Sequence, residues 1–211
     1  MEQLLLEKMQ AYAALHHVPI LLEPSTVVLM QAARDKRPSR VLEVGTAIGY
    51  SSLLIAREML PGGQLISIDT DGDRQKIATH FLAQTELAIN IEFVTGDACE
   101  VIAELAGGFD FVFIDAAKGQ YVNYLLALLP LLQTGAVIVA DNVLFRGWVE
   151  SDIEPPRRYR TIVCRLQQYL AIVRDKALFA TEVYDVGDGL AVSVYQGKPI
   201  KETVQEGDDN G

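Results

Sequence analysis

The sequence predicts an α/β fold in which helices cover both faces of a doubly wound, mostly parallel sheet. Three observations predict it. Short apolar runs alternate with segments of helical periodicity along most of the chain. A glycine-containing turn at residues 43–49 joins the first of these runs to a helix. Two later runs end at acidic residues, Asp115 and Asp141, which parallel strands would place at one edge of the sheet.

The composition is that of an ordinary globular domain. The 211 residues, with a mass of 23.2 kDa, are 50% hydrophobic and 22% charged. No apolar run approaches the roughly 18 residues that a membrane span requires, and the first residues show no signal-peptide pattern, so we expect a cytoplasmic protein. Residues 1–197 are expected to form one domain, and residues 198–211 a mobile polar tail. Cys99 and Cys164 lack metal-ligand spacing and are expected to be buried, inert thiols.

Each element is predicted from local signals. Residues 1–17 carry apolar side chains at helical spacing and are followed by Pro19, and Pro24 suits the start of a second helix at 24–33. Five strands are then predicted at 40–44, 64–68, 91–95, 109–114 and 136–140. Helices are predicted between them at 50–60, 73–86, 98–105 and 118–132. After a helix at 160–173, runs at 179–186 and 190–195 flank Gly-Asp-Gly and predict an antiparallel hairpin.

Oxygen-bearing side chains follow two neighbouring strands of the predicted sheet. Asp115 ends one strand, and Asp141 and Asn142 follow the next. Adjacent strands lie about 4.8 Å apart, so these hard oxygen ligands can converge on Mg²⁺ or another divalent cation. Lys118 stands at a helix start, against the helix dipole, and is a candidate general base beside such a cation. The alternatives are loop capping by the carboxylates and a solvated Lys118.

The glycine turn favours a cofactor without phosphates. Residues 45–49 read Gly-x-Ala-x-Gly, which lacks the dinucleotide fingerprint and the P-loop lysine. S-adenosylmethionine (SAM) needs only a close-approach turn with polar neighbours, here Glu43, Thr46 and Ser51. Asp69 ends the second strand, where it would accept hydrogen bonds from ribose hydroxyls. The alternatives are a tight turn without a ligand and an N-cap role for Asp69.

Charge is unevenly distributed along the chain. The formal net charge of −10 argues against simple nonspecific binding of nucleic acid. Residues 155–174, however, contain five arginines and no acidic residue, so this segment carries +5 and the remainder −15. The segment would either contact phosphates or form a solvated amphipathic helix, with Arg165 exposed and Ile162, Leu166 and Tyr169 buried.

Three strings resemble the metal-dependent class I O-methyltransferases, the family that contains catechol and caffeoyl-CoA methyltransferases. They are Glu43-Val-Gly-Thr-Ala-Ile-Gly-Tyr-Ser51, Phe113-Ile-Asp-Ala-Ala-Lys-Gly-Gln-Tyr121 and Ala140-Asp-Asn-Val-Leu-Phe-Arg-Gly147. The resemblance implies a single SAM-dependent methyltransferase domain with a seven-stranded Rossmann-like sheet, usually as a homodimer. It implies catalytic roles for Lys118 and Asp115, and metal ligation by Asp115, Asp141 and Asn142. The implied SAM contacts are Leu21, Glu43, Gly45, Thr46, Ser51, Asp69, Ala98 and Asp115.

Within this family the strings are most similar to bacterial methyltransferases that form 5-methoxyuridine from 5-hydroxyuridine at the tRNA wobble position. The likeness extends to residues 16–20 and to the arginine-rich segment, although an N-terminal extension of that subgroup is not found. Both 5-hydroxyuridine and a catechol present two adjacent oxygens, so one metal site serves either. The leading hypothesis is therefore a tRNA anticodon substrate. The alternatives are a small catechol or caffeoyl-CoA type substrate and a noncatalytic SAM-binding protein.

Candidate substrate contacts come from residues 121–148 and from the start of the arginine-rich segment. Aromatic side chains there would stack on an unpaired base or line a catechol pocket, or they would only pack in the core or in a dimer interface. These aromatic residues are Tyr121, Tyr124, Phe145 and Trp148. The candidate substrate contacts are Tyr124, Arg146, Trp148, Arg157 and Arg158.

Overall fold

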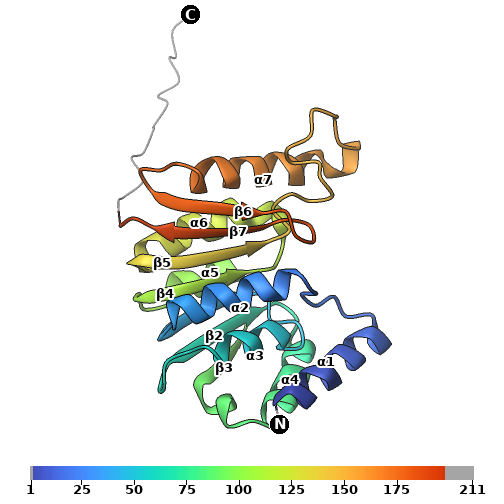
Figure 1. Ribbon diagram of the computed structural model, residues 1–211, viewed down its shortest axis with the longest axis vertical. Helices are drawn as coiled ribbons and strands as arrows, with labels where there is room; N and C mark the ends of the chain where they lie inside the picture. Colours follow the sequence, from blue (N-terminus) through green and yellow to red (C-terminus); the bar gives the residue numbers. More distant parts are fainter. Residues whose placement is uncertain (1, 198–211) are drawn as a thin grey trace, which may run out of the picture.

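A computed structural model describes residues 2–197 of the protein, with the side chains of residues 88 and 89 left out. One seven-stranded sheet has the order β3-β2-β1-β4-β5-β7-β6 (Figure 1). β1 to β5 pair in parallel, and β7 pairs antiparallel with both of its neighbours. The strands are β1 (Arg40–Val44), β2 (Gln64–Asp69), β3 (Ile91–Thr95), β4 (Phe109–Ile114), β5 (Leu132–Asp141), β6 (Phe179–Tyr184) and β7 (Leu190–Tyr195). The predicted fold class and C-terminal hairpin are confirmed.

Helices cover both faces of this sheet (Figure 1). They are α1 (Glu2–His16), α2 (Ser25–Lys36), α3 (Tyr50–Ala56), α4 (Gly72–Leu82), α5 (Ala98–Glu104), α6 (Tyr121–Leu128) and α7 (Arg160–Val173). One apolar cluster joins α5, α6 and α7 to one face, and a second joins α2 and α3 to the other. The helix α1 packs beside α3 and α4 in a third cluster. None of the helices within residues 2–197 is long and apolar enough to cross a membrane.

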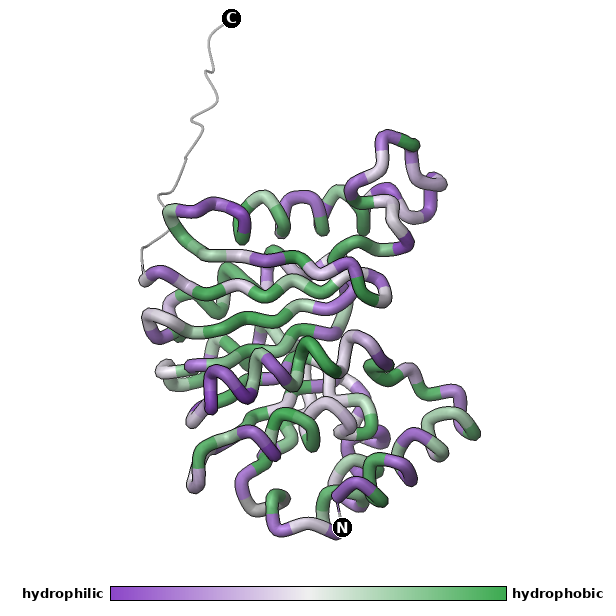
Figure 2. Tube along the Cα trace, in the orientation of Figure 1, coloured by the Kyte–Doolittle hydropathy of each residue, from purple (hydrophilic) through white to green (hydrophobic). Residues whose placement is uncertain are grey.

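The central strands carry unbroken apolar runs because both of their faces are covered. In β4, Val112 and Ile114 enter the cluster with α5 to α7, whereas Phe111 and Phe113 enter the cluster with α2 and α3. In Figure 2 the strands of the sheet are mostly hydrophobic along their length, and polar residues gather on the outer turns of the helices. This packing holds the carboxyl ends of β1, β4 and β5 in fixed positions.

Several predicted boundaries were wrong. The helix predicted at 118–132 is divided into η2 (Lys118–Gln120), α6 and η3 (Leu129–Leu131), because Pro130 cannot donate the hydrogen bond that would continue α6. The strand β5 starts earlier than predicted, and Asp141 is its last residue. The predicted helices at 50–60 and 73–86 end early, at Ala56 and Leu82, and η1 (Glu86–Asn90) follows the second.

Other expectations concern the ends and the thiols. The tail predicted to be mobile, residues 198–211, lies outside the described residues. Cys164 is exposed on α7 and Cys99 is only partly buried, so the expectation of two buried thiols was wrong for Cys164. Cys164 falls between the buried positions of α7, where an amphipathic helix faces solvent.

Candidate functional site

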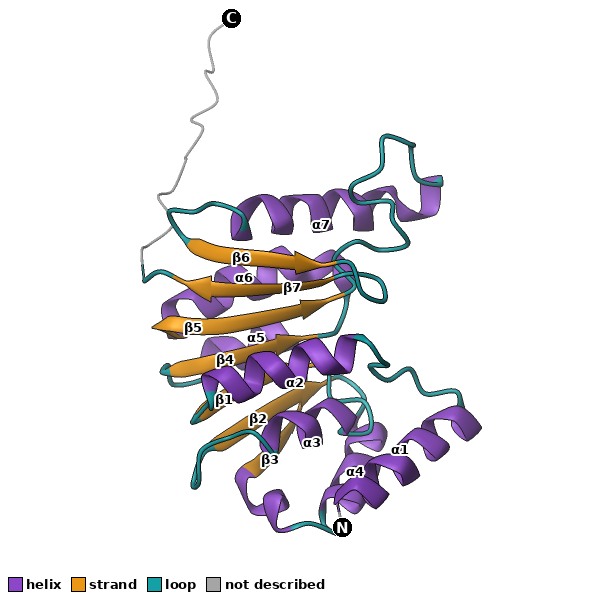
Figure 3. Cartoon of the chain, in the orientation of Figure 1, coloured by secondary structure: helices purple, strands orange, loops and turns teal. Residues whose placement is uncertain are grey.

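A cleft of about 440 Å³ opens at the carboxyl ends of the parallel strands. It lies where the strand order reverses, between β1 and β4, which is the place where open α/β sheets bind ligands. Figure 3 shows the arrowheads of β4 and β5 pointing to this edge, with the connection between α1 and α2 on the same side, and β1 and β2 run parallel to these strands. The volume falls in the range of about 300–1,000 Å³ that is typical of small-molecule sites.

Most of the sequence-predicted site residues line this one cleft. The lining includes Leu21, Gly45, Thr46, Ser51, Asp69, Ala98, Asp115, Lys118, Tyr124, Asp141 and Asn142. Glu43 is fully buried and does not reach the cleft wall. Four proposed substrate contacts are also absent from the lining: Arg146, Trp148, Arg157 and Arg158.

Asp69 holds the glycine turn in place. Its Oδ2 accepts hydrogen bonds from the backbone N–H groups of Thr46 at 3.0 Å and Ala47 at 2.8 Å. Its Oδ1 accepts one from the N–H of Asp71 at 2.9 Å. Asp71, not Asp69, is the N-cap of α4, so the N-cap alternative for Asp69 was wrong. Asp69 therefore supports the turn while it faces the cleft.

Glu43 lies beneath the same turn. Its carboxylate accepts hydrogen bonds from the hydroxyls of Ser51 and Ser67, each at 2.5 Å, and from that of Ser52. Burial raises the pKa of Glu43 to about 7, although the three hydroxyls oppose this rise. Of these serines, Ser51 also lines the cleft. Glu43 does not line the cleft, but it holds the hydroxyl of a residue that does, Ser51.

Gly45 brings the turn against the acidic half of the cleft. Its φ is +106°, a conformation that glycine adopts readily, and a Cβ placed there would lie 2.0 Å from the backbone oxygen of Asp115. Glycine is therefore required by close approach as well as by φ. The turn on β1 and the end of β4 form one packed unit.

The two carboxylates at the strand ends destabilise one another. Asp141 is only 5% exposed, and its Oδ1 is a buried oxygen without a hydrogen-bond partner among the described residues. Burial and the nearby charge of Asp115 raise the pKa of Asp141 to about 7. Burial also raises the pKa of Asp115, and the charge of Lys118 lowers it in part. A bound cation would stabilise this arrangement, because it would offset the repulsion between the two carboxylates and give the buried Asp141 Oδ1 a partner.

The donors available at this point fit a divalent cation that prefers oxygen. Within residues 2–197 no group of three or more His, Cys, Asp or Glu side chains is placed to hold a metal. A three-ligand set here requires the side-chain oxygen of Asn142 in addition to the two carboxylates. Asn142 has a φ of +57°, in the left-handed region that asparagine tolerates better than most residues.

Lys118 is the first residue of η2 and lines the cleft. It is partly buried, and it forms no ion pair within 4 Å with any residue of the described chain. Its charge nevertheless acts on both Asp115 and Asp141. A lysine amine in this position is available to a ligand in the cleft.

The arginine-rich segment is the amphipathic helix that was its alternative interpretation. Arg165 is exposed on α7 and Leu166 and Tyr169 are fully buried, whereas Ile162 is only partly buried. Arg160 pairs with Glu154 at 2.8 Å. Arg174 likewise pairs with an acidic residue of the preceding loop, Glu150, at 2.5 Å. Two acidic residues that precede the segment 155–174 therefore neutralise part of its positive charge.

The aromatic candidates separate into different roles. Tyr121 is fully buried in the core, so the stacking interpretation was wrong for it. Tyr124 is 5% exposed yet lines the cleft. Phe145 packs edge-to-face on Tyr159, with ring centroids 5.5 Å apart. Trp148 is partly buried against the core.

Sequence reasoning missed several lining residues. They include Pro19, Ile20, Tyr50, Thr70, Arg74 and Asp97. Asp97 could have been predicted, because it lies just after β3, much as Asp69 lies at the end of β2. In the structure Asp97 is the N-cap of α5, where its carboxylate accepts hydrogen bonds from two backbone N–H groups. The likeness at residues 16–20 assigned no role to Pro19 and Ile20, because the connection between α1 and α2 reaches the cleft only in the folded chain.

The fold and the cleft define a Rossmann-like α/β protein with its candidate ligand site at the switch point of the sheet. The chain belongs to the O-methyltransferase family, whose sequence profile matches residues 25–195. Caffeoyl-CoA O-methyltransferase 2 from Petunia hybrida is 32% identical over 162 residues, which are 72% of this chain and 66% of that protein. Catechol O-methyltransferase from Mycobacterium tuberculosis is 40% identical over 116 residues, 54% of this chain and 53% of that protein.

A solved structure extends the likeness to the fold. The O-methyltransferase TomG from Streptomyces achromogenes, involved in tomaymycin synthesis and solved in complex with SAM, has a TM-score of 0.80 and 26% identity. The match covers 91% of this chain and 89% of that protein. The chain therefore matches nearly the whole of this structure but less than two thirds of the length of the two curated relatives. Membership of the O-methyltransferase family, which the three sequence strings implied, is confirmed. The metal dependence and the tRNA substrate that they also implied stay predictions.

Proposed function

We propose that this protein is a SAM-dependent O-methyltransferase that requires a divalent cation and acts on a small catechol-like molecule with two adjacent oxygens. One observation carries the proposal. A single cleft combines a glycine turn anchored by Asp69 with two carboxylates at neighbouring strand ends, the partly buried Asp115 and the buried Asp141, and with Lys118. The names of the petunia and mycobacterial relatives support a substrate of this class.

The cofactor would lie on the glycine-turn side of the cleft. SAM supplies a methyl group on a sulfonium. Gly45 and Thr46 let a ligand approach the backbone, and Asp69 faces the same space. Leu21, Ser51 and Ala98 complete this part of the lining. The SAM complex of TomG supports this cofactor.

The acidic side of the cleft would hold the metal and the acceptor oxygen. Asp115, Asp141 and Asn142 would ligate Mg²⁺ or a related ion, which when bound supplies positive charge next to the acceptor oxygen. Lys118 takes the proton of the hydroxyl. In the displacement the bond from carbon to sulfur breaks as the bond from carbon to oxygen forms. Because Gly45 packs on the backbone of Asp115, the two reacting groups are held in one frame.

The test offers catechols and hypomodified tRNA together with labelled SAM and Mg²⁺. We expect the label in a catechol, loss of turnover on addition of EDTA, and recovery with excess Mg²⁺. Asp141→Asn should bind SAM and fail to turn over, because it removes one charge from the proposed ligand set. Full turnover in the presence of EDTA, or in Asp141→Asn, would contradict the proposal. A protein that binds SAM and methylates no substrate would instead be the noncatalytic binder.

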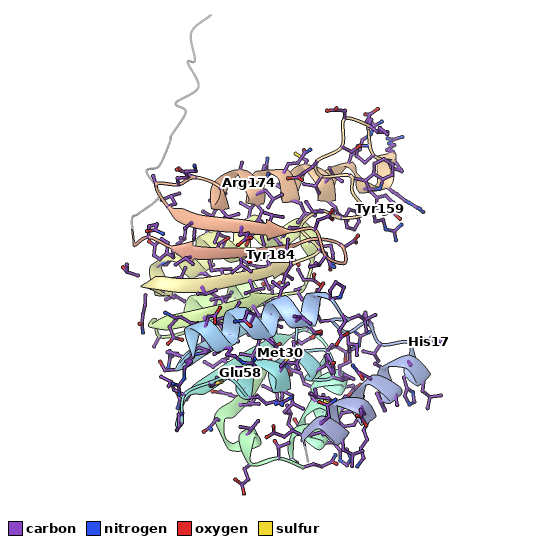
Figure 4. All side chains as sticks on the ribbon, in the orientation of Figure 1. His17, Met30, Glu58, Tyr159, Arg174 and Tyr184 are labelled. Carbon is purple, nitrogen blue, oxygen red and sulfur yellow. The ribbon has the colours of Figure 1, made fainter. Side chains whose placement is uncertain are left out.

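A second candidate substrate is 5-hydroxyuridine in a tRNA anticodon. The guanidinium carbons of Arg146 and Arg158 lie 5.3 Å and 4.5 Å from the centroid of the Tyr159 ring, and neither guanidinium forms an ion pair within 4 Å in the described chain. Figure 4 places Tyr159 at the side of the molecule to which the carboxyl ends of the parallel strands point. Two unpaired cations there favour an anionic substrate.

The two substrates are distinguished by arginine variants. If tRNA is the substrate, the pair Arg146→Gln and Arg158→Gln, which removes the two cations beside Tyr159, should weaken tRNA methylation and its dependence on salt. Methylation of a neutral catechol should be unchanged in the same variant. If the labelled methyl group enters tRNA and no catechol, tRNA is the substrate and the small-molecule proposal is wrong. Trp148 is kept as a further proposed contact of this larger substrate.

We also propose a homodimer. Leu4 and Leu15 of α1 are 57% and 74% exposed, and Leu22 and Val27 beyond it are 64% and 58% exposed. Exposed apolar side chains on neighbouring elements support burial against a second copy. Light scattering of the purified chain tests this. The mass of one chain at micromolar concentration would contradict it.

A further inference from the structure

Tyr121 lies directly behind the acidic half of the cleft, although it does not line it. It is the first residue of α6 and is 0% exposed. Its hydroxyl donates a hydrogen bond to the backbone carbonyl of Asp141 at 2.9 Å, and the carbonyl oxygen of Ile114 lies 3.4 Å from the same hydroxyl. A single side chain therefore contacts the ends of both β4 and β5.

The contact lies where the pairing of these two strands ends. The last register pair between β4 and β5 is Ile114 with Ala140. Beyond it the backbone of Asp115 donates to the carbonyl of Val44 on β1 at 2.9 Å, and Asp141 pairs with Leu190 on β7. The two strand ends are thus bound to different neighbours just where their carboxylates begin. No register pair sets the spacing of Asp115 and Asp141.

We propose that Tyr121 is a positioning residue that sets the separation of Asp115 and Asp141 through its hydroxyl. The proposal rests on the proposed function, because it assigns these two carboxylates to one metal site. Ligands held at the wrong separation bind a metal more weakly, and loss of a supporting hydrogen bond to a ligand residue typically costs about 10–100-fold in affinity.

Tyr169 provides a matched control in the same cluster. Its ring packs on that of Tyr121 in a T-shaped arrangement with centroids 5.6 Å apart, and it is equally buried. Its hydroxyl has no hydrogen-bond partner among the described residues. Tyr169→Phe and Tyr121→Phe therefore remove the same atom from two neighbouring, equally buried rings. Only Tyr121→Phe removes a contact with the strand ends.

The experiment measures Mn²⁺ binding by electron paramagnetic resonance to the wild-type chain and both variants, without substrate. We expect the dissociation constant for Mn²⁺ to rise about 10–100-fold in Tyr121→Phe and to stay within twofold in Tyr169→Phe. The dissociation constant for SAM, measured separately by calorimetry, should stay within twofold in both. If Tyr121→Phe is too unstable to purify, the double variant Tyr121→Phe, Tyr169→Phe is compared with Tyr169→Phe alone. The second substitution removes the buried Tyr169 hydroxyl, which has no hydrogen-bond partner among the described residues and therefore costs stability in the wild-type chain.

The outcomes separate this inference from the proposed function. Wild-type affinity in Tyr121→Phe, or an equal loss in Tyr169→Phe, would overturn the positioning role and leave the metal site standing. If the wild-type chain itself does not bind Mn²⁺, the metal site and the positioning role both fail. A loss of SAM affinity equal to the loss of Mn²⁺ affinity would show a general disturbance of the cleft and would also overturn the positioning role.

Discussion

Replacement of Gly45 by alanine tests whether the glycine turn must lie against the backbone of Asp115. The added Cβ would lie 2.0 Å from the Asp115 carbonyl oxygen, whereas such contacts in proteins are essentially never shorter than 3.0 Å. The turn or the end of β4 would therefore have to move by about 1 Å. The φ of +106° adds backbone strain of about 1–3 kcal/mol for any residue with a Cβ.

Gly62 supplies the control for backbone strain. Its φ is +79°, and a Cβ placed there would meet nothing within 4 Å. It precedes β2, at the end of that strand opposite the cleft. Gly62→Ala should therefore lose about 1 kcal/mol of the free energy of unfolding and no activity. Gly45→Ala should lose more stability, and a displacement of about 1 Å should lower kcat/KM by about 100-fold.

Three measurements decide the matter. Urea denaturation gives the free energies of unfolding, calorimetry gives the SAM dissociation constants, and steady-state kinetics gives kcat/KM with the best acceptor. If Gly45→Ala matches Gly62→Ala within twofold in SAM affinity and kcat/KM, the close approach does not position the site, and the reasoning is wrong.

Three further perturbations follow from buried polar contacts. Burial raises the pKa of Glu43 from its ordinary 4.5 to about 7. Between pH 4.5 and 7 the folded chain therefore holds a proton that the unfolded chain releases, and the free energy of unfolding falls as the pH rises through this range. Glu43→Gln should reduce this fall by up to about 1.4 kcal/mol per pH unit, as measured by urea denaturation at pH 5, 6 and 7. Asp110→Ala should cost about 1–3 kcal/mol in the same assay without changing kcat, because its carboxylate accepts hydrogen bonds from two backbone N–H groups at the start of β1, far from the cleft; a fall in kcat would contradict this. Gln75→Leu should raise the SAM dissociation constant, because the buried amide donates to Thr46 in the turn at 3.2 Å and to the Val94 carbonyl at 3.0 Å; unchanged SAM affinity would show that the turn does not need this support.

Much of the fold could be predicted because the central strands are buried on both faces. An unbroken apolar run such as Phe109–Ile114 has few alternatives to an interior strand, and such runs also fix where the strand ends lie. The convergence of Asp115 and Asp141 followed from that topology, since parallel neighbours end at one edge. Asp69 was placed at the cleft for the same reason.

The rest depended on contacts that no local pattern contains. The charge of the arginine-rich segment was counted over 155–174, but the acidic partners of Arg160 and Arg174 precede that window. Tyr121 is an aromatic residue of the kind that stacks on bases, and only the folded chain shows that its hydroxyl instead contacts the backbone at the ends of β4 and β5. The split of the helix predicted at 118–132 matters for the same reason, because it makes Tyr121 the first residue of α6.

The two halves of the cleft depend on each other through the end of β4. Gly45 contacts the carbonyl oxygen of Asp115 from the cofactor side, and the Tyr121 hydroxyl lies near the carbonyl oxygen of Ile114, the preceding residue, from the other side. Because backbone atoms make both contacts, neither requires a particular side chain at the residue contacted, and sequence patterns record neither contact. A displacement of this strand end would change the glycine turn and the spacing of the carboxylates together. If the proposed function and the positioning role of Tyr121 are correct, this one short stretch of backbone would set the placement of both the methyl donor and the acceptor oxygen, with Gly45 on one side of it and the Tyr121 hydroxyl on the other.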